Sequence, residues 1–553
     1  MRRLLPALLL CLPLLSCGDD PATPAPEPGP STETPAVSAL LPLDPPRLAR
    51  RLSLDLRGVL PTLEELDAVA ADPAALETLR EQWLADPRFE AQMVRLYQER
   101  WLTSIDDYRV FYTDHRLEVN QQYDFLRTVG EEPLRLIARV LAEDLPYTEI
   151  VTADWTMSND LALEMWLVEE IEAGGGGWRP ARYTDGRPAA GVLSTNGMWI
   201  RYISPTFNYN RGRTATLIKL LACDDFLERP VSVSGNVSLT AGAADEAIRT
   251  NPTCIACHAA MEPVAATLFG FIALADQNHL EMERYHVERE NLGPATLQVE
   301  PAWFGTPVDG LEDLGRAIAL DPRFAACAVE TLSEGLLRRQ TTVEDFDLLT
   351  GARADFLRDE LRGKAVVRAI TRSAAYQAGA LTAEASPAEI EGATTARLLL
   401  ASHLRSLLAD LGGFTWITGG WDMLDNDLFG YRVLGGAVDG ELLTEPQRFP
   451  GLTWTLTQTR VAEVAGPHLA VQALAGDGRL LPALSEDLRP GDAPFRALLG
   501  RAHWGLLAVA ATDEELDELE AHWSAVFGLT SSLDAAWGSV LTVVMLDPRF
   551  LTY

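Results

Sequence analysis

The stretch Cys254-Ile255-Ala256-Cys257-His258 constrains this chain more than any other. It has the C-x-x-C-H pattern of c-type haem attachment, in which two thiols bond to the vinyl groups of one porphyrin. The histidine that follows becomes the proximal ligand of the iron. The histidine also separates this pattern from a plain redox C-x-x-C pair. The sequence therefore predicts one covalent haem c on Cys254 and Cys257, with His258 as its proximal ligand.

Other interpretations of the motif stay open. The two thiols could form a structural disulfide, or the motif could carry no haem. A zinc site is disfavoured, because it needs a second pair of ligands at a suitable spacing and the sequence offers none. The distal ligand is not set by the motif. Met198 and His279 are candidates by residue type, and an open distal position is an equal alternative.

Residues 1–17 have the composition of an export signal. Arg2 and Arg3 precede an apolar run that is too short to span a bilayer as a mature helix. The run ends in Leu14-Leu15-Ser16-Cys17, which resembles the lipobox of bacterial lipoproteins and implies that Cys17 is lipidated. The alternative is an ordinary secretory peptide that is cleaved nearby. Either interpretation exports the chain to a compartment where haem c can be attached.

Residues 18–44 are rich in proline and predict a disordered linker between the anchor and the folded body. Acidic residues outnumber basic ones by 79 to 46, giving a formal net charge of −33. Nucleic acid is disfavoured as a partner, because binding it requires a basic patch. We expect the membrane, through the lipid anchor, and an unidentified redox protein as partners. The expected location is the outer membrane, on its periplasmic or its surface face.

Two cysteines remain after the signal, the anchor and the motif are set aside. These are Cys223 and Cys327, and in an oxidising compartment an isolated pair is a candidate for a disulfide. Two separate buried thiols are the alternative.

The rest of the chain has mainly helical periodicity. The predicted fold is mainly α, with several domains built as helical bundles, few short strands and one c-type-cytochrome-like module. The expected divisions are a helical domain over 45–235, a haem-motif region with a following helical module over 236–385, and a C-terminal helical domain over 386–553. The phrase Asp-Pro-Arg-Phe occurs at 86–89, 321–324 and 547–550, and predicts a repeated helix start with Asp as its cap.

Several phrases, in order along the chain, resemble the planctomycete-type cytochrome-like proteins, linked domains of unknown function in large exported proteins that include many myxobacterial lipoproteins. The first phrase is residues 51–65, the second is residues 145–159, the third is residues 191–193 with 210–213, and the motif phrase is residues 249–258 with Met261 and Pro263; a further phrase is residues 431–436 with 439–440. After the motif the family has Met-Asp-Pro, whereas this chain has Met261-Glu262-Pro263. The resemblance also favours a disulfide between Cys223 and Cys327. It implies no established reaction.

The leading hypothesis is an anchored c-type cytochrome that transfers single electrons. A haem enzyme such as a peroxidase and a haem-free helical scaffold lipoprotein are the alternatives. No nucleophile triad or spaced pair of carboxylates emerges from the sequence, so no catalytic residue is assigned.

Overall fold

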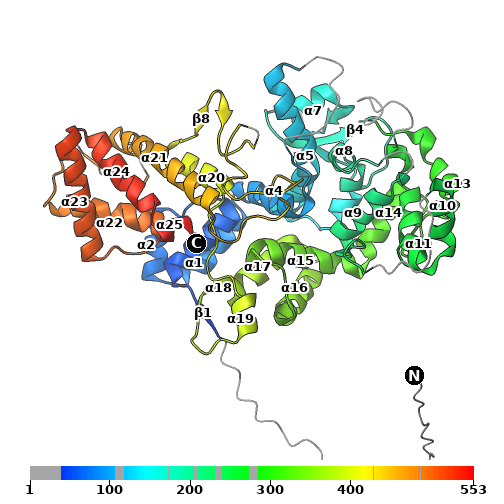
Figure 1. Cartoon of the computed structure of the whole chain (residues 1–553), viewed down its shortest axis with the longest axis horizontal. Coiled ribbons are helices and arrows are strands. Elements are labelled where there is room, and N and C mark those ends of the chain that lie inside the picture. Colours follow the sequence, from blue (N-terminus) through cyan, green and yellow to red (C-terminus); the bar gives the residue numbers. More distant parts are fainter. Residues whose placement is uncertain are drawn as a thin grey trace, which may run out of the picture. The chain divides into compact units, whose positions relative to one another are not determined.

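The computed structural model describes residues 39–105, 117–171, 174–204, 208–230, 240–272, 284–427, 429–477, 479–481, 484–485 and 487–553. Leu40–Tyr553 form one compact unit. Two residues singled out from the sequence, Cys17 and His279, lie outside the described residues. The described part is mainly helical with few short strands, which confirms the predicted fold class at that level (Figure 1).

Among the described residues, the part of the unit up to residue 222 contains nine α-helices. They are α1 (Pro45–Arg57), α2 (Leu63–Ala71), α3 (Ala75–Leu84), α4 (Arg88–Trp101), α5 (Val119–Ala142), α6 (Glu149–Thr152), α7 (Asp160–Met165), α8 (Asn196–Arg201) and α9 (Arg211–Ala222), as far as the described residues go. The next are α10 (Ala241–Thr250), α11 (Pro252–Ala266), α13 (Leu292–Leu297), α14 (Leu311–Leu320), α15 (Pro322–Leu337), α16 (Phe346–Arg358), α17 (Gly363–Arg372) and α18 (Ala374–Gln377). Most of these helices contribute to one large hydrophobic core.

The C-terminal helices build a second large core. They are α20 (Ala401–Gly412), α21 (Leu452–Leu474), α22 (Ala493–Leu507), α23 (Asp513–Thr530), α24 (Leu533–Met545) and α25 (Pro548–Leu551). The short helix α19 (Pro387–Gly392) precedes them. Leu54 and Leu60, which belong to the N-terminal region, complete this second core. The two cores therefore meet at the first helix.

The strands are short and lie in small antiparallel sheets. They are β1 (Leu40–Pro42), β2 (Thr156–Ser158), β3 (Val168–Glu170), β4 (Arg179–Tyr183), β5 (Ala302–Trp303), β6 (Thr306–Pro307), β7 (Ala378–Leu381), β8 (Ile417–Thr418) and β9 (Trp421–Asp422). β1 pairs with β7, β2–β4–β3 form one sheet, and β5–β6 and β8–β9 are two-stranded. Sheets of this size add local order to a helical fold.

The pairing of β1 with β7 corrects the expected end of the proline-rich linker. The sequence predicted a linker over 18–44, but Leu40 lies opposite Leu381 and Leu41 lies opposite Ala380. Leu43, directly after β1, is buried in the main core. The reason is the apolar run at residues 40–43, which can bury its side chains although the residues before it are rich in proline and small polar groups.

Helix α1 has clear signals at both ends. The side chain of Asp44 accepts a hydrogen bond from the backbone N–H of Arg47 at 3.2 Å, and proline occupies the first turn. Gly58 ends the helix at φ 69°, in the left-handed region that favours glycine. Every residue from Leu48 to Arg57 is buried. A helix covered on all sides lies between other elements rather than on the surface.

Polar side chains of α1 are bonded to residues far along the chain. Arg50 donates hydrogen bonds to the carbonyl oxygens of Leu506, Phe550 and Thr552. The buried carboxylate of Asp55 accepts hydrogen bonds from the hydroxyl groups of Tyr376 and Tyr553. In Figure 1 the blue helices α1 and α2 accordingly lie beside the red helices α22 and α25.

The three Asp-Pro-Arg-Phe phrases adopt closely similar local structures. In each phrase the aspartate accepts hydrogen bonds from the backbone N–H and the guanidinium of the arginine two positions later. The three phenylalanines, Phe89, Phe324 and Phe550, are buried. The predicted helix start with Asp as its cap is confirmed at Asp321 and Asp547, whereas at the first phrase the cap position before α4 is Pro87 and Asp86 lies one residue earlier.

Candidate functional site

The motif occupies the first two turns of helix α11. Asn251 precedes the helix and accepts a hydrogen bond from the backbone N–H of Thr253 at 2.9 Å, and Pro252 is the first helical residue. Cys254 and Cys257 are three positions apart and therefore share one face of the helix. Both are free and partly buried. Asn251 and Pro252 thus place the motif at the start of a helix.

His258 follows on the same turn, and its ring is held by a carboxylate. Nδ1 of His258 lies 2.7 Å from Oε1 of Glu262, one helical turn later. The side chain of His258 is 22% exposed, whereas that of Glu262 is 9% exposed. Among the described residues, none forms a hydrogen bond with Nε2 of His258. The contact with Glu262 therefore leaves Nε2 available.

Glu262 is fixed by a second helix. Arg211, the first residue of α9, reaches Oε1 of Glu262 with Nε at 2.6 Å and Oε2 with Nη2 at 3.2 Å. Burial by itself would raise the pKa of Glu262, but hydrogen bonds from His258 and Arg211 outweigh it and hold this pKa below its ordinary value. Glu262 is therefore ionised at neutral pH and can only accept hydrogen bonds.

This ionised acceptor defines the tautomer of His258. A carboxylate cannot donate, so the proton of the neutral imidazole lies on Nδ1 and the lone pair lies on Nε2. A histidine that binds a metal through one nitrogen usually donates the other N–H to a carboxylate or a carbonyl group. Two free thiols on one helix face and an adjacent imidazole with an available Nε2 fit the groups that covalent haem requires.

The candidate distal ligand that the structure describes lies in the core. Met198, in α8, has no exposed surface and belongs to the main hydrophobic core. Its role as a distal ligand stays a prediction. Two arginines near Met198 are bonded within the fold: Arg213 donates to the carbonyl oxygens of Trp199, Tyr202 and Phe271, and Arg201 donates to those of Leu102 and Gly440.

Cys223 and Cys327 lie together in the structure as a disulfide. The bond joins the C-terminal end of α9 to α15, 104 residues later. A guanidinium nitrogen of Arg100 lies 2.7 Å from Sγ of Cys223. Helix α9 is therefore fixed at its end by the disulfide, and Arg211 at its start contacts Glu262.

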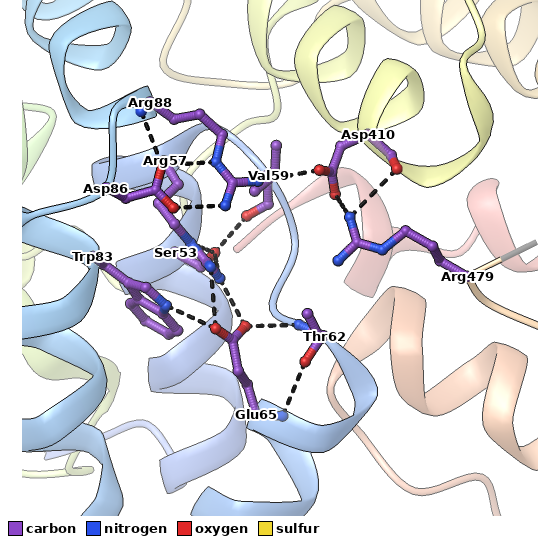
Figure 2. A network of polar contacts seen from close by, with 10 residues as sticks. All are labelled: Ser53, Arg57, Val59, Thr62, Glu65, Trp83, Asp86, Arg88, Asp410 and Arg479. Atoms are coloured by element: carbon purple, nitrogen blue, oxygen red, sulfur yellow. Dashed lines mark hydrogen bonds and ion pairs between the residues drawn. The ribbon is translucent and has the colours of Figure 1, made fainter.

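The first phrase forms a structural network rather than a reactive site (Figure 2). Thr62 and Glu65 make a capping box at the start of α2, and Glu65 also accepts hydrogen bonds from Arg57 and from the indole N–H of Trp83 at 2.9 Å. Ser53 accepts hydrogen bonds from Arg57 and donates to the carbonyl oxygen of Val59 at 2.6 Å. These hydrogen bonds join the C-terminal end of α1 to the start of α2, so the polar residues of the phrase have a structural role.

The second and third phrases meet at a hollow of about 250 Å³. Its lining includes Asp154, Trp155 and Thr156 from the second phrase and Gly191 from the third. Behind it lies Glu132, a buried carboxyl group that accepts hydrogen bonds from Thr156, Tyr183 and the backbone N–H of Gly197. Burial raises the pKa of Glu132. The sequence analysis missed this network, because Glu132 lies in a helix without any motif around it.

Glu262 was also missed as a partner of His258, since it was noted only as a departure from the family phrase. The signal was present: a carboxylate four positions after a histidine lies on the same face of a helix. The contact of the third phrase with the motif phrase, through Arg211 and Glu262, had no signal in the sequence, because 51 positions separate the two residues.

Two further tests concern metal ions and membranes. Within the described ranges, His, Cys, Asp and Glu side chains form no group of three or more that is suited to hold a metal ion. Among the described helices, none combines the length and the apolar character that crossing a membrane requires.

Comparison with known proteins gives one match. Residues 32–163 match a family model described as PSCyt2, protein of unknown function (DUF1549). The match includes the first phrase and the second phrase, and it ends before the haem motif. Neither the curated proteins nor the solved structures gave a match. The N-terminal part of this chain is therefore similar to a planctomycete-type domain of unknown function.

Proposed function

We propose that this protein is an exported, lipid-anchored c-type cytochrome that transfers single electrons. The observation that carries the proposal is the arrangement on α11: free Cys254 and Cys257 share one face, and His258 follows with Nε2 available. The bound haem would supply one-electron redox chemistry. The chain's own residues would attach it, provide the proximal imidazole and hold that imidazole in one tautomer.

The location follows from the segment before the folded body. An acyl group on Cys17 would anchor the chain to a membrane, and the proline-rich residues up to 39 would separate the body from the lipid surface. The predicted site is the outer membrane, on either face. An unidentified redox protein is the proposed electron partner, and the acidic composition favours a partner with a basic or neutral surface.

A haem enzyme such as a peroxidase is the second candidate. The observation that favours it is the carboxylate at Nδ1 of His258, because such a partner raises the basicity of the ligand. An open distal position would then admit a small substrate. A haem-free scaffold lipoprotein is the remaining alternative.

One preparation tests all three. The full chain is produced with a c-haem maturation system, and haem that survives denaturing electrophoresis is stained, with a Cys254→Ala/Cys257→Ala variant as control. The proposal predicts covalent haem in the wild type and none in the variant. If the wild-type protein carries no haem, the haem-free scaffold lipoprotein is the remaining candidate. A high-spin spectrum with turnover of peroxide would favour the enzyme, and a low-spin reduced spectrum would favour the electron carrier.

A further inference from the structure

The chain of contacts His258–Glu262–Arg211 connects the last residue of the motif to a second helix. Oε1 of Glu262 receives both Nδ1 of His258 at 2.7 Å and Nε of Arg211 at 2.6 Å. Nη2 of Arg211 reaches the second oxygen at 3.2 Å, so the guanidinium grips the carboxylate at two points. A two-point contact fixes the plane of the carboxylate as well as its position.

The contact with Glu262 is made by a separate helix, α9, so the position of the Arg211 guanidinium does not depend on α11 alone. Arg211 begins α9, and the opposite end of α9 is joined to α15 by the Cys223–Cys327 disulfide. Asp245 in α10 lies 3.6 Å from Arg211 and adds a second acidic neighbour. The carboxylate therefore stays in place when the imidazole changes its bonding partner at Nε2.

We propose that Glu262 is the positioning residue of the proximal histidine, and that its negative charge lowers the midpoint potential of the haem. The inference rests on the proposed function. Glu262 keeps the proton of His258 on Nδ1, turns Nε2 toward the position of the metal, and strengthens electron donation by the imidazole. An anion close to the iron also stabilises the more positive oxidation state.

The test compares three variants of the full chain after haem maturation. Glu262→Gln removes the charge and keeps the size of the side chain. Glu262→Asp keeps the charge but is one methylene shorter, so it weakens the contact with His258. Glu246→Gln is the matched control, because Glu246 is an exposed residue of the neighbouring helix α10 and its loss changes the net charge equally.

Potentiometry and the iron–histidine stretching frequency in resonance Raman spectra are the two readouts. In Glu262→Gln we expect a midpoint potential that is more positive by about 59 mV, a tenfold change in the equilibrium constant for one electron. The stretching frequency should fall, since the imidazole donates less. Glu262→Asp should shift both readouts in the same direction by less, and Glu246→Gln should leave the stretching frequency unchanged.

The possible results separate the two proposals. Haem-bound Glu262→Gln protein with an unchanged potential and an unchanged stretching frequency would overturn the role of Glu262 and leave the cytochrome standing. Wild-type protein without haem would overturn both. Loss of haem from both Glu262 variants, with retention in Glu246→Gln and circular dichroism like that of the wild type, would support the positioning role.

Discussion

Helices α1 and α11 both carry polar side chains, but they differ in whether these side chains have partners within the fold. In α1, Arg50, Arg51 and Asp55 are buried and bonded to groups within the fold. In α11, Cys254 and Cys257 are free and partly buried, and Nε2 of His258 is available. The polar side chains of α1 are therefore bonded within the fold, whereas two thiols and one imidazole nitrogen of α11 are not.

The largest expected effect comes from Asp55 in α1. Asp55→Asn leaves the buried guanidinium of Arg397 without its charge partner, and breaking a buried ion pair in this way costs about 3–5 kcal/mol. The free energy of unfolding, measured with urea, should fall by that amount. Asp67→Asn is the matched control, because its pair with Arg501 is exposed and should contribute less than about 1 kcal/mol. Equal losses of stability in both variants would contradict a stabilising role of the buried Asp55–Arg397 pair.

The next largest loss of stability is expected from removal of the Cys223–Cys327 disulfide, which anchors helix α9 beside the motif. Replacing both Cys223 and Cys327 with serine opens a loop of 104 residues and should cost about 2–4 kcal/mol. A reductant should lower the unfolding midpoint of the wild type and leave that of the variant unchanged. A wild type that is insensitive to reductant would show that α9 needs no covalent anchor.

A smaller effect is expected at the start of α2. Thr62→Ala removes the side-chain acceptor for the backbone N–H of Glu65, and loss of such a cap costs about 1 kcal/mol. Ser386→Ala, in the capping box of the exposed short helix α19, is the control and should cost less. A larger loss in the control would argue that the network of Figure 2 does not hold α1 in place.

The aspartate caps should respond to pH. Burial would raise the pKa of Asp321, but hydrogen bonds from Arg323 and Trp303 outweigh it, so the folded-state pKa lies below the ordinary value of about 3.9. The contribution of Asp321 to stability is therefore fully present above the unfolded-state pKa and is lost as the pH falls through the folded-state pKa. Asp321→Asn should cost less than about 1 kcal/mol at pH 7, and this difference should vanish in acid. A difference that persists in acid would contradict the ionic origin.

The smallest effect on stability is expected for the motif thiols. In the haem-free chain, Cys254→Ala/Cys257→Ala should change the free energy of unfolding by about 0.5 kcal/mol or less, since neither thiol has a bonding role in the fold. The same change should abolish covalent haem. A loss above about 2 kcal/mol would show that these thiols stabilise the fold, as the buried polar side chains of α1 do.

Much of the fold follows from local signals. The helical periodicity of the C-terminal part is confirmed by helices such as α22, α23 and α24, and α23 and α24 begin at the side-chain caps Thr512 and Ser532. The contact of Arg211 with Glu262 and those of Arg50 with Phe550 and Thr552 could not be predicted, because they join residues from distant parts of the chain and depend on tertiary packing.

The contacts of α1 have a consequence for the order of folding. Arg50 and Asp55 find partners at Phe550 and Tyr553, with separations of 500 and 498 positions. During synthesis the helix that emerges first must wait for nearly the whole chain before its buried charges are neutralised and its carbonyl partners appear. Contacts of such long range slow folding. The N-terminal helix is therefore among the last elements to reach its final surroundings, and synthesis of the C-terminal helices determines when that happens.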